Sequence, residues 1–372
     1  MNICPAAAIS MEADEKGFLY PSVDKNKCTD CGLCSQVCAF QKGGLFQNLR
    51  HEIYAVKHRN LSIRLSSSSG GMFSALCQYV IRFGGTVYGA AFDSSFSVVH
   101  TRADTLEACE AFRGAKYVQS RLGQTFRQVR QDLLDGRMVL FSGTPCQVDS
   151  LKSYLKNVRG GTLITCDVVC HGVPSPLIWH EYLNFMGENP GISHISFRDK
   201  CRGWHHSEIR IDREDGTCLS MSHGRNPFSY LYFSHYILRT CCGSCPYACM
   251  QRAGDISIGD FWGMEQTMAD FDDDQGVTLT FINSQLGRKI FDAIRPELIV
   301  REVSESECSQ PNLSHPSSLR RDEENFWRDY RCRGFQYVVN RYTPCGKASA
   351  GIEVRRFISR LIHKFQKYLT EH

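Results

Sequence analysis

Four cysteines near the start of the chain have the spacing of an iron–sulfur ligand run. They are Cys28, Cys31, Cys34 and Cys38, in the pattern C-x2-C-x2-C-x3-C. Such a run ligates 4Fe–4S clusters, and its last cysteine normally serves the other cluster of a pair. The first three cysteines therefore need a fourth ligand from elsewhere. Cys4, followed by Pro5 as at the end of an upstream run, is the candidate, so that these four thiols are predicted to hold one cluster.

Cys38 is then left without the other three ligands of its own cluster, because the chain begins at Met1, just ahead of Cys4. We interpret residues 1–45 as a ferredoxin-type 4Fe–4S module that is shortened at its N-terminus, either naturally or by a misplaced start. A zinc knuckle is the alternative, but zinc knuckles favour paired C-x2-C units. A start further upstream would restore a cluster to Cys38, which therefore stays among the candidate metal ligands.

A second group of cysteines lies in the middle of the chain. Cys146 and Cys170 each follow a predicted strand, and Cys242 and Cys245 form a C-x2-C pair. These four thiols could close a further 4Fe–4S site, although three separate segments would have to converge for this. Cys146 also lies at a predicted helix N-terminus, where a lowered thiol pKa is expected.

A run of small residues precedes a predicted helix that begins at Met72. The candidate residues in it are Ser67, Ser68, Ser69, Gly70 and Gly71. Free N–H groups at a helix N-terminus bind phosphate, so this turn is a candidate phosphate site. A serine N-cap with a flexible turn is the alternative. Lys116 could reach an anionic cofactor there, although a solvated surface lysine is the more common outcome.

The elements that would position these residues alternate between strands and helices. Strands are predicted at 52–57, 86–93, 138–143 and 163–169, and helices at 72–83, 125–135 and 144–155. This alternation is typical of a parallel α/β sheet that binds ligands at the carboxyl ends of its strands. Residues 192–220 are predicted to be β-rich, and 228–238 to be helical. The fold class is therefore α+β or α/β, with a small ferredoxin-like module before a mixed α/β body.

Composition limits the classes of partner and compartment. The 372 residues carry a net charge of +4, which is too weak to indicate nucleic-acid binding. The chain has nineteen cysteines, and the metal-type spacing of some of them without a visible signal peptide indicates a reducing cytoplasm. No apolar run is long enough to span a membrane. Residues 353–369 are predicted to form a basic amphipathic helix, either docked on the protein or in peripheral contact with a partner or the inner membrane face.

Several motifs in the same order resemble one known family. They are Ser67–Gly71, Gly143–Gln147, Cys170–Ser175, Phe197–Lys200, Gly203-Trp204, Cys242-x2-Cys245 and Gly259–Gly263. Residues 50–300 resemble the beta subunit of the coenzyme F420-reducing hydrogenases and dehydrogenases, in which a ferredoxin module in front is also common. The basic helix at 353–369 departs from the family pattern. The resemblance divides the chain into the module at 1–45, two parts of the body at 46–125 and 126–300, and a tail at 301–372.

The resemblance implies an iron–sulfur flavoprotein. Its FAD would lie between a protein-bound cluster and the hydride-accepting coenzyme, with Ser67–Gly71, Lys116 and Thr144 as cofactor-binding residues. Our hypothesis is a relay in which a ferredoxin-like redox partner delivers electrons to the first cluster, and these pass through the second cluster to FAD and then to a small-molecule substrate. His171, His205 and His206 are candidate proton donors, although a structural role is more common for such residues.

Two other functions stay open at the sequence level. The chain could be a non-catalytic electron-transfer or scaffold subunit with a degenerate flavin site. It could also carry out a redox step in surface-polysaccharide biosynthesis, because similar proteins occur beside such genes in bacteria that do not make coenzyme F420. The substrate, the direction of electron flow and the catalytic acid or base do not follow from the sequence.

Overall fold

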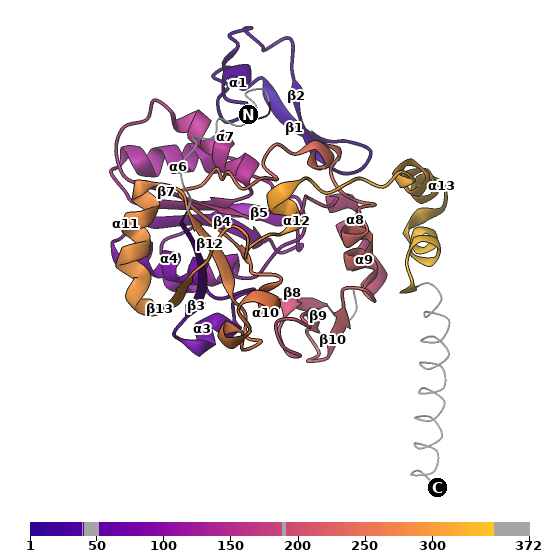
Figure 1. The fold of residues 1–372 in the computed structure, drawn as a ribbon. Helices are drawn as coiled ribbons and strands as arrows, with labels where there is room; N and C mark the ends of the chain where they lie inside the picture. Colours follow the sequence, from indigo (N-terminus) through magenta and orange to yellow (C-terminus); the bar gives the residue numbers. More distant parts are fainter. Residues whose placement is uncertain (39, 41–51, 188–190, 346–372) are drawn as a thin grey trace.

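A computed structural model describes residues 1–38, 40, 52–187 and 191–345 of the chain. Within these residues the body is built on a twisted eight-stranded sheet (Figure 1). From edge to edge its strands are β13 (Leu298–Glu302), β3 (Glu52–His58), β12 (Thr278–Ile282), β11 (Ile256–Asp260), β7 (Leu163–Val168), β6 (Val139–Gly143), β4 (Thr86–Phe92) and β5 (Val98–Ala103).

The four middle strands β11, β7, β6 and β4 are parallel, and the outer strands pair antiparallel. Parallel strands are buried on both faces, so they need apolar side chains on both. This explains why Val139, Leu140 and Phe141 are all fully buried. The mixed α/β class expected from the sequence is confirmed, and strands from 46–125 and from 126–300 share this one sheet.

Helices cover both faces of the sheet. The helices α4 (Met72–Arg82) and α11 (Gln285–Ile294) share a core with Val87, Leu140 and Ile164 on one face. On the opposite face, α6 (Thr125–Leu134) and α7 (Pro145–Leu155) pack on Tyr88 and Phe141. The alternation of side chains along β4 and β6 therefore assigns each strand residue to one of two cores.

A second layer lies beside the sheet. The antiparallel strands β8 (Ile192–Asp199), β9 (Glu208–Arg213) and β10 (Cys218–Ser222) pack with α8 (Pro176–Met186), α9 (Pro227–Phe233) and α13 (Glu323–Tyr342). Their core contains the fully buried Trp179 and, from α13, Trp327. Gly334, with φ 77°, interrupts α13. The predicted helix at 228–238 ends earlier, at Phe233, because the chain turns there through a left-handed His235.

The N-terminal module is a small hairpin with one short helix. It contains β1 (Ile9–Ala13), β2 (Leu19–Val23) and α1 (Leu33–Gln36) and sits above the body in Figure 1. Arg127 of α6 donates to the carbonyl oxygens of Asn2 at 2.9 Å and Cys4 at 3.3 Å. The module is therefore docked on the body by backbone-directed hydrogen bonds.

Short elements complete the described chain. They are α3 (Leu61–Leu65), α5 (Leu106–Cys109), α10 (Met264–Thr267), α12 (Pro311–Ser314) and the 3-10 turns η1 (Glu110–Phe112), η2 (Thr240–Ser244), η3 (Ala269–Phe271) and η4 (Arg295–Glu297). Among the helices of the described ranges, none has the length and apolarity needed to cross a bilayer. The predicted basic helix at 353–369 lies outside the described residues.

Candidate functional site

A large cavity of about 1150 Å³ lies at the carboxyl ends of the parallel strands. Its walls include Ala90 of β4, Gly143 at the end of β6, Val168 at the end of β7 and Gly259 of β11. The predicted site residues that line it are Ser67, Ser68, Ser69, Gly71, Lys116, Thr144, Cys146 and Cys170. The fold thus brings together segments far apart in sequence at the edge where an α/β sheet binds ligands.

The serine turn, defined as Ser67–Gly71, leads directly into α4. Gly71 has φ 92° and caps the helix without a side-chain hydrogen bond, so the first N–H groups of α4 receive no side-chain cap from it. Ser68 Oγ accepts a hydrogen bond from the Ala115 N–H at 2.7 Å, which ties the turn to the loop that carries Lys116. The turn and this loop therefore form one continuous wall.

Gly70 has a packing role that the sequence pattern does not reveal. It does not line the cavity, and its N–H donates to Thr278 Oγ1 at 2.8 Å. A Cβ at this position would overlap the Val56 carbonyl oxygen and lie 2.6 Å from the Thr278 nitrogen. Glycine is needed here because the turn lies directly against β3 and β12.

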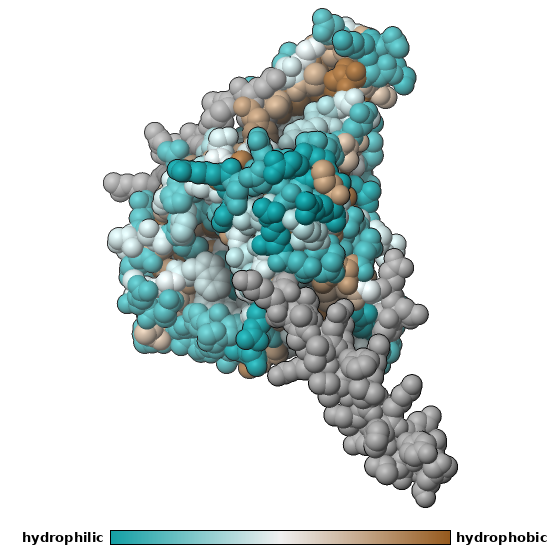
Figure 2. Space-filling model, turned by 90° about the vertical axis from the view of Figure 1, so that its right-hand side faces the viewer, coloured by the Kyte–Doolittle hydropathy of each residue, from teal (hydrophilic) through white to brown (hydrophobic). Residues whose placement is uncertain are grey.

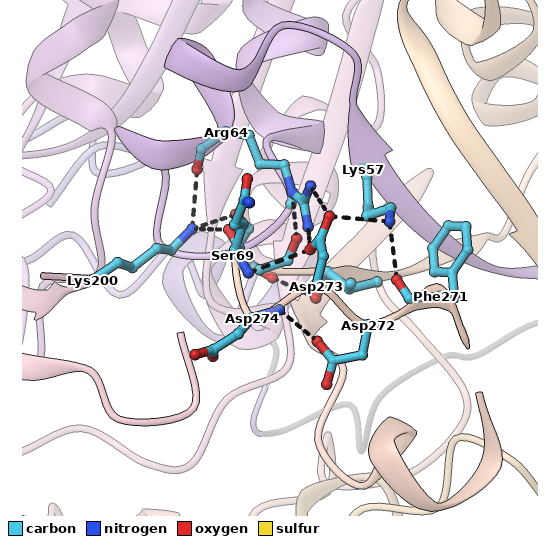
Figure 3. Close-up of polar contacts among 12 residues, drawn as sticks. Lys57, Arg64, Ser69, Lys200, Phe271, Asp272, Asp273 and Asp274 are labelled. Carbon is cyan, nitrogen blue, oxygen red and sulfur yellow. Dashed lines mark hydrogen bonds and ion pairs between the residues drawn. The ribbon is translucent and has the colours of Figure 1, made fainter. Parts of the chain in front are cut away.

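Lys200 anchors the serine turn, and Figure 3 shows its side chain reaching towards Ser69. Its Nζ donates to the carbonyl oxygens of Ser69 at 2.8 Å, Gln275 at 2.9 Å and Arg64 at 3.0 Å. Burial lowers the pKa of Lys200 to about 7. Arg64 in turn is ion-paired with Asp273. A lysine from the second layer thus joins the turn to the loop that precedes β12.

Lys116 is half-buried in the wall of the cavity. Its Nζ donates to the carbonyl oxygens of Arg113 at 2.9 Å and Gly114 at 3.1 Å and lies 5.9 Å from the centre of the Phe92 ring. Burial lowers its pKa to about 7. Burial alone accounts for this shift, and no carboxylate of the described residues offsets it. An anion that enters the cavity would therefore stabilise the charged form of Lys116.

The inner thiols lie at the same end of the sheet. Cys146 is in the first turn of α7, Cys170 follows β7, and Cys242 and Cys245 lie in η2 and directly after it. A Cβ at Gly172 would lie 3.4 Å from the Cys242 Cβ, so the loop after β7 contacts η2. Cys146, Cys170 and Cys245 also act electrostatically on one another. The three predicted segments therefore do approach each other.

Burial dominates the acidity of these thiols. It raises the pKa of Cys146 to about 11, although a hydrogen bond from Thr144 opposes the shift, and it raises that of Cys170 to about 12. The expected lowering of the Cys146 pKa at a helix N-terminus is therefore wrong, because desolvation outweighs the favourable end of the helix. Bound iron would reverse this balance, since a coordinating thiol is deprotonated.

Cys241 belongs to the same group, although the spacing did not single it out. Its charge affects the pKa of Cys146. A hydrogen bond with Cys242 lowers the pKa of Cys241 to about 6. The same hydrogen bond, together with burial, raises the pKa of Cys242. The donors here are thiols, which suit an iron–sulfur cluster better than a hard cation. Across the described ranges, no group of three or more histidine, cysteine, aspartate or glutamate side chains is arranged so that it could hold a metal ion. The ligand assignments stay predictions.

The N-terminal cysteines lie in a different environment. Cys28, Cys31 and Cys34 are exposed, whereas Cys4 is half-buried and accepts the Ala8 N–H at 3.3 Å. Burial lowers the pKa of the Met1 ammonium group, and the charges of Cys4 and Cys34 oppose this shift. Both thiols therefore lie near the Met1 nitrogen. Asp30 and Gly32 have φ of 54° and 70°, which gives the loop between the cysteines its tight turns. Cys38 is half-buried nearby.

The module also contributes to the wall of the cavity. Met1, Asn2, Met11 and Leu19 line it together with body residues. Figure 2 shows a mostly hydrophilic face with hydrophobic residues gathered towards the top, where the module lies. Met11 is 41% exposed on the hairpin. The first cysteine group is thus next to both the cavity and an apolar surface.

Several cavity residues were not expected from the sequence. His100 of β5 is buried, its Nε2 lies 3.0 Å from the Ser142 carbonyl oxygen, and burial lowers its pKa to about 4. Arg198 of β8, Arg239 and Trp262 also line the cavity. The Phe197–Lys200 and Gly259–Gly263 motifs were the available signals for Arg198 and Trp262, whereas His100 and Arg239 had none.

The three histidines considered from sequence differ in position. His171 and His205 line the cavity, and His206 is exposed and does not. The Nε2 atom of His171 lies 3.0 Å from that of His235, and His205 Nε2 lies 2.5 Å from Asp272 Oδ2. Each lining histidine is thus held by another side chain.

Comparison with known proteins gives one family. Residues 136–306 match the family model for the C-terminal part of the beta subunit of coenzyme F420 hydrogenase/dehydrogenase. Among solved structures, the chain is similar to a chain of the F420-reducing NiFe hydrogenase complex from Methanosarcina barkeri, with a TM-score of 0.45 and 16% identity, over 68% of this chain and 82% of that chain. No curated protein matches the chain.

Proposed function

Because residues 136–306 match the family model for the C-terminal part of the coenzyme F420 hydrogenase/dehydrogenase beta subunit, we propose that the chain is an oxidoreductase subunit that binds 4Fe–4S clusters and FAD. Its reaction is hydride exchange with a small molecule, either coenzyme F420 or another compound.

One observation carries this proposal. Predicted cofactor residues from three separate segments, the serine turn, Lys116 and Thr144, line the same cavity as Cys146 and Cys170. Its volume of about 1150 Å³ exceeds the range of roughly 300–1,000 Å³ that is usual for one ligand. The cavity is thus large enough for a dinucleotide, and thiols stand at its wall.

The residues of the cavity have distinct roles in this proposal. The serine turn and the first N–H groups of α4 would hold the diphosphate of FAD, and Lys116 would supply a positive charge. Thr144 would keep the start of α7 in place, because its N–H donates to Gln147 Oε1 at 2.9 Å. When bound, the clusters would carry single electrons and the flavin would exchange a hydride.

The N-terminal module is the entry port for electrons in this proposal. Cys4, Cys28, Cys31 and Cys34 would hold the outer cluster, and Cys146, Cys170, Cys242 and Cys245 the inner one. Exposed thiols beside exposed apolar residues such as Met11 and Val23 suit the docking of a ferredoxin-like redox partner. A cytoplasmic location fits cysteines used as metal ligands.

Anaerobic purification of the full chain tests the proposal. We expect about eight irons and eight acid-labile sulfides for two 4Fe–4S clusters, and one FAD for each chain. A preparation that contains iron but no flavin would contradict the proposed enzymatic function and favour a non-catalytic electron-transfer protein. The variant Lys116→Met should weaken FAD binding, whereas Lys289→Met, an exposed lysine on α11, should not.

A further inference from the structure

Arg198 stands out among the cavity residues because it is a buried cation with free donors. It lies on β8, is 8% exposed and lines the cavity. Its Nη1 atom is 3.3 Å from Asp260 Oδ2, and its guanidinium lies 4.7 Å from the centre of the Trp262 ring. Trp262 stacks on Trp204, whose Nε1 donates to Asp260 Oδ1 at 3.2 Å. The guanidinium plane is therefore fixed.

The Tyr117 hydroxyl interacts with this guanidinium, but the edge formed by Nε and Nη2 has no acceptor of the described chain within hydrogen-bond distance. Nε and Nη2 of Arg198 are buried and have no hydrogen-bond partner among the described residues. Buried polar groups in proteins are nearly always paired, so two free donors on one rigid side chain indicate a missing ligand. Nε–H and Nη2–H point the same way and form the fork that matches two oxygens of a carboxylate or phosphate.

Neighbouring groups support an anion at this position. Burial opposes the charge of Arg198, but Asp260 and the Tyr117 hydroxyl outweigh this and raise its pKa, so the side chain stays a cation. Nε2 of His223, a second cavity residue, is likewise buried and unpaired in the described part of the chain. Asp260 is already engaged at Nη1, so it does not satisfy the free edge.

The Arg198 position differs from the serine turn. Arg198 is held by Asp260 and Trp262 at the end of β11, whereas the serine turn is held by Thr278 and Lys200. We propose that the Nε and Nη2 edge of Arg198 binds a carboxylate or phosphate group of the small-molecule substrate. This inference rests on the proposed function, in which the serine turn takes the diphosphate of FAD.

The test uses the full chain loaded with FAD and inorganic phosphate as the probe, with binding measured by calorimetry. Arg198→Met should weaken phosphate binding by about tenfold to a hundredfold, the usual loss for hydrogen bonds to a charged group. The phosphate affinity of Arg198→Lys should lie between those of the wild type and Arg198→Met, because lysine keeps the positive charge but lacks the two parallel N–H donors. Arg202→Met is the matched control. That arginine follows β8, is 72% exposed, does not line the cavity, and should leave phosphate binding unchanged.

The same variants separate the two sources of an anion. If Arg198→Met weakens FAD affinity and leaves phosphate binding to the loaded chain unaltered, the fork holds the cofactor and the assignment to the substrate is overturned. Equal phosphate affinity in the wild type and both Arg198 variants would overturn the site itself. If the wild type binds no FAD, the proposed function fails, and an Arg198-dependent phosphate site in the flavin-free chain still supports the anion fork. Circular dichroism checks that each variant is folded.

Discussion

The two cysteine groups differ in their exposure and in how many chain segments supply them. Cys28, Cys31 and Cys34 are exposed on one short loop of the N-terminal module, whereas Cys146, Cys170 and Cys242 are partly buried at the ends of different elements. Burial raises the pKa of Cys146 and Cys170, and the hydrogen bond with Cys241 together with burial raises that of Cys242. Three of the four proposed outer ligands lie on one short loop of the module, so loss of the outer site should leave the body folded. An inner site made by three segments ties those segments together.

The largest effect is expected at the inner site. Cys170→Ser should remove about four irons of the proposed eight. Because a ligand that binds only the folded state stabilises it, thermal unfolding of the holoprotein should also shift down by roughly 5 °C or more. Iron analysis and calorimetry measure the two changes. Cys201→Ser, at an exposed cysteine, should alter neither, and an unchanged iron content in Cys170→Ser would remove this residue from the ligand set.

Substitution of an outer ligand should remove iron without lowering the unfolding temperature of the body. Cys31→Ser should also remove about four irons, but the main unfolding transition should stay in place because the module contributes no strand to the large sheet. Cys38→Ser should leave the iron content unaltered. Loss of iron in Cys38→Ser would contradict the ligand set of Cys4, Cys28, Cys31 and Cys34.

The docking of the module can be weakened without touching a thiol. Arg127→Met removes the two hydrogen bonds to the Asn2 and Cys4 carbonyl oxygens. We expect a loss of about 0.5–1.5 kcal/mol, as for a typical exposed hydrogen-bonded side chain, and faster proteolytic release of the module. Arg130→Met, at an exposed arginine on the same helix, is the control, and equal proteolysis rates for both variants would exclude this contact as the anchor.

A pH dependence is also expected in the body. The pKa of Lys116 is about 7 in the folded chain and 10.5 for an ordinary lysine. Between these values the unfolded chain binds the proton and the folded chain does not, so this lysine makes stability rise with pH from about 7 to 10. FAD affinity should move the other way, up to about tenfold weaker at pH 8.5 than at pH 6, since an anion needs the charged form.

Lys116→Met should flatten both curves, as followed by chemical unfolding and by flavin fluorescence. Lys200 also has a pKa of about 7, so a residual slope is expected in the single variant. A wild-type FAD affinity that does not change between pH 6 and 8.5 would contradict the role of Lys116 as the positive charge beside FAD.

The helices and strands around the site could be predicted because each is marked by residues within its own segment. Pro145 after Thr144 marks the start of α7, and apolar runs such as Val139–Gly143 mark the buried strands. The helix α13 gave no such signal. Its sequence is polar, and Gly334 breaks its periodicity. Trp327 and Phe335 nevertheless anchor it in the second core.

Other features depended on tertiary structure and could not be predicted. The role of Gly70 comes from Val56 and Thr278, which lie on strands distant in sequence. The acidity of Cys146 depends on how deeply α7 is buried, which the helix N-terminus alone does not reveal. Arg198 became a candidate only once Asp260 and Trp262 were seen to hold its other edge.

The contact between the first hairpin and α13 has a consequence for biosynthesis. Lys16 Nζ donates to Glu323 Oε1 at 2.7 Å across 307 residues of sequence. The ammonium group also lies 5.6 Å from the centre of the Trp327 ring. A ribosome that adds about 5–20 residues per second would deliver the hairpin roughly 15–60 s before its partner. The contact between Lys16 and α13 would therefore form later than the contacts of the module with Arg127, which is made much earlier in synthesis.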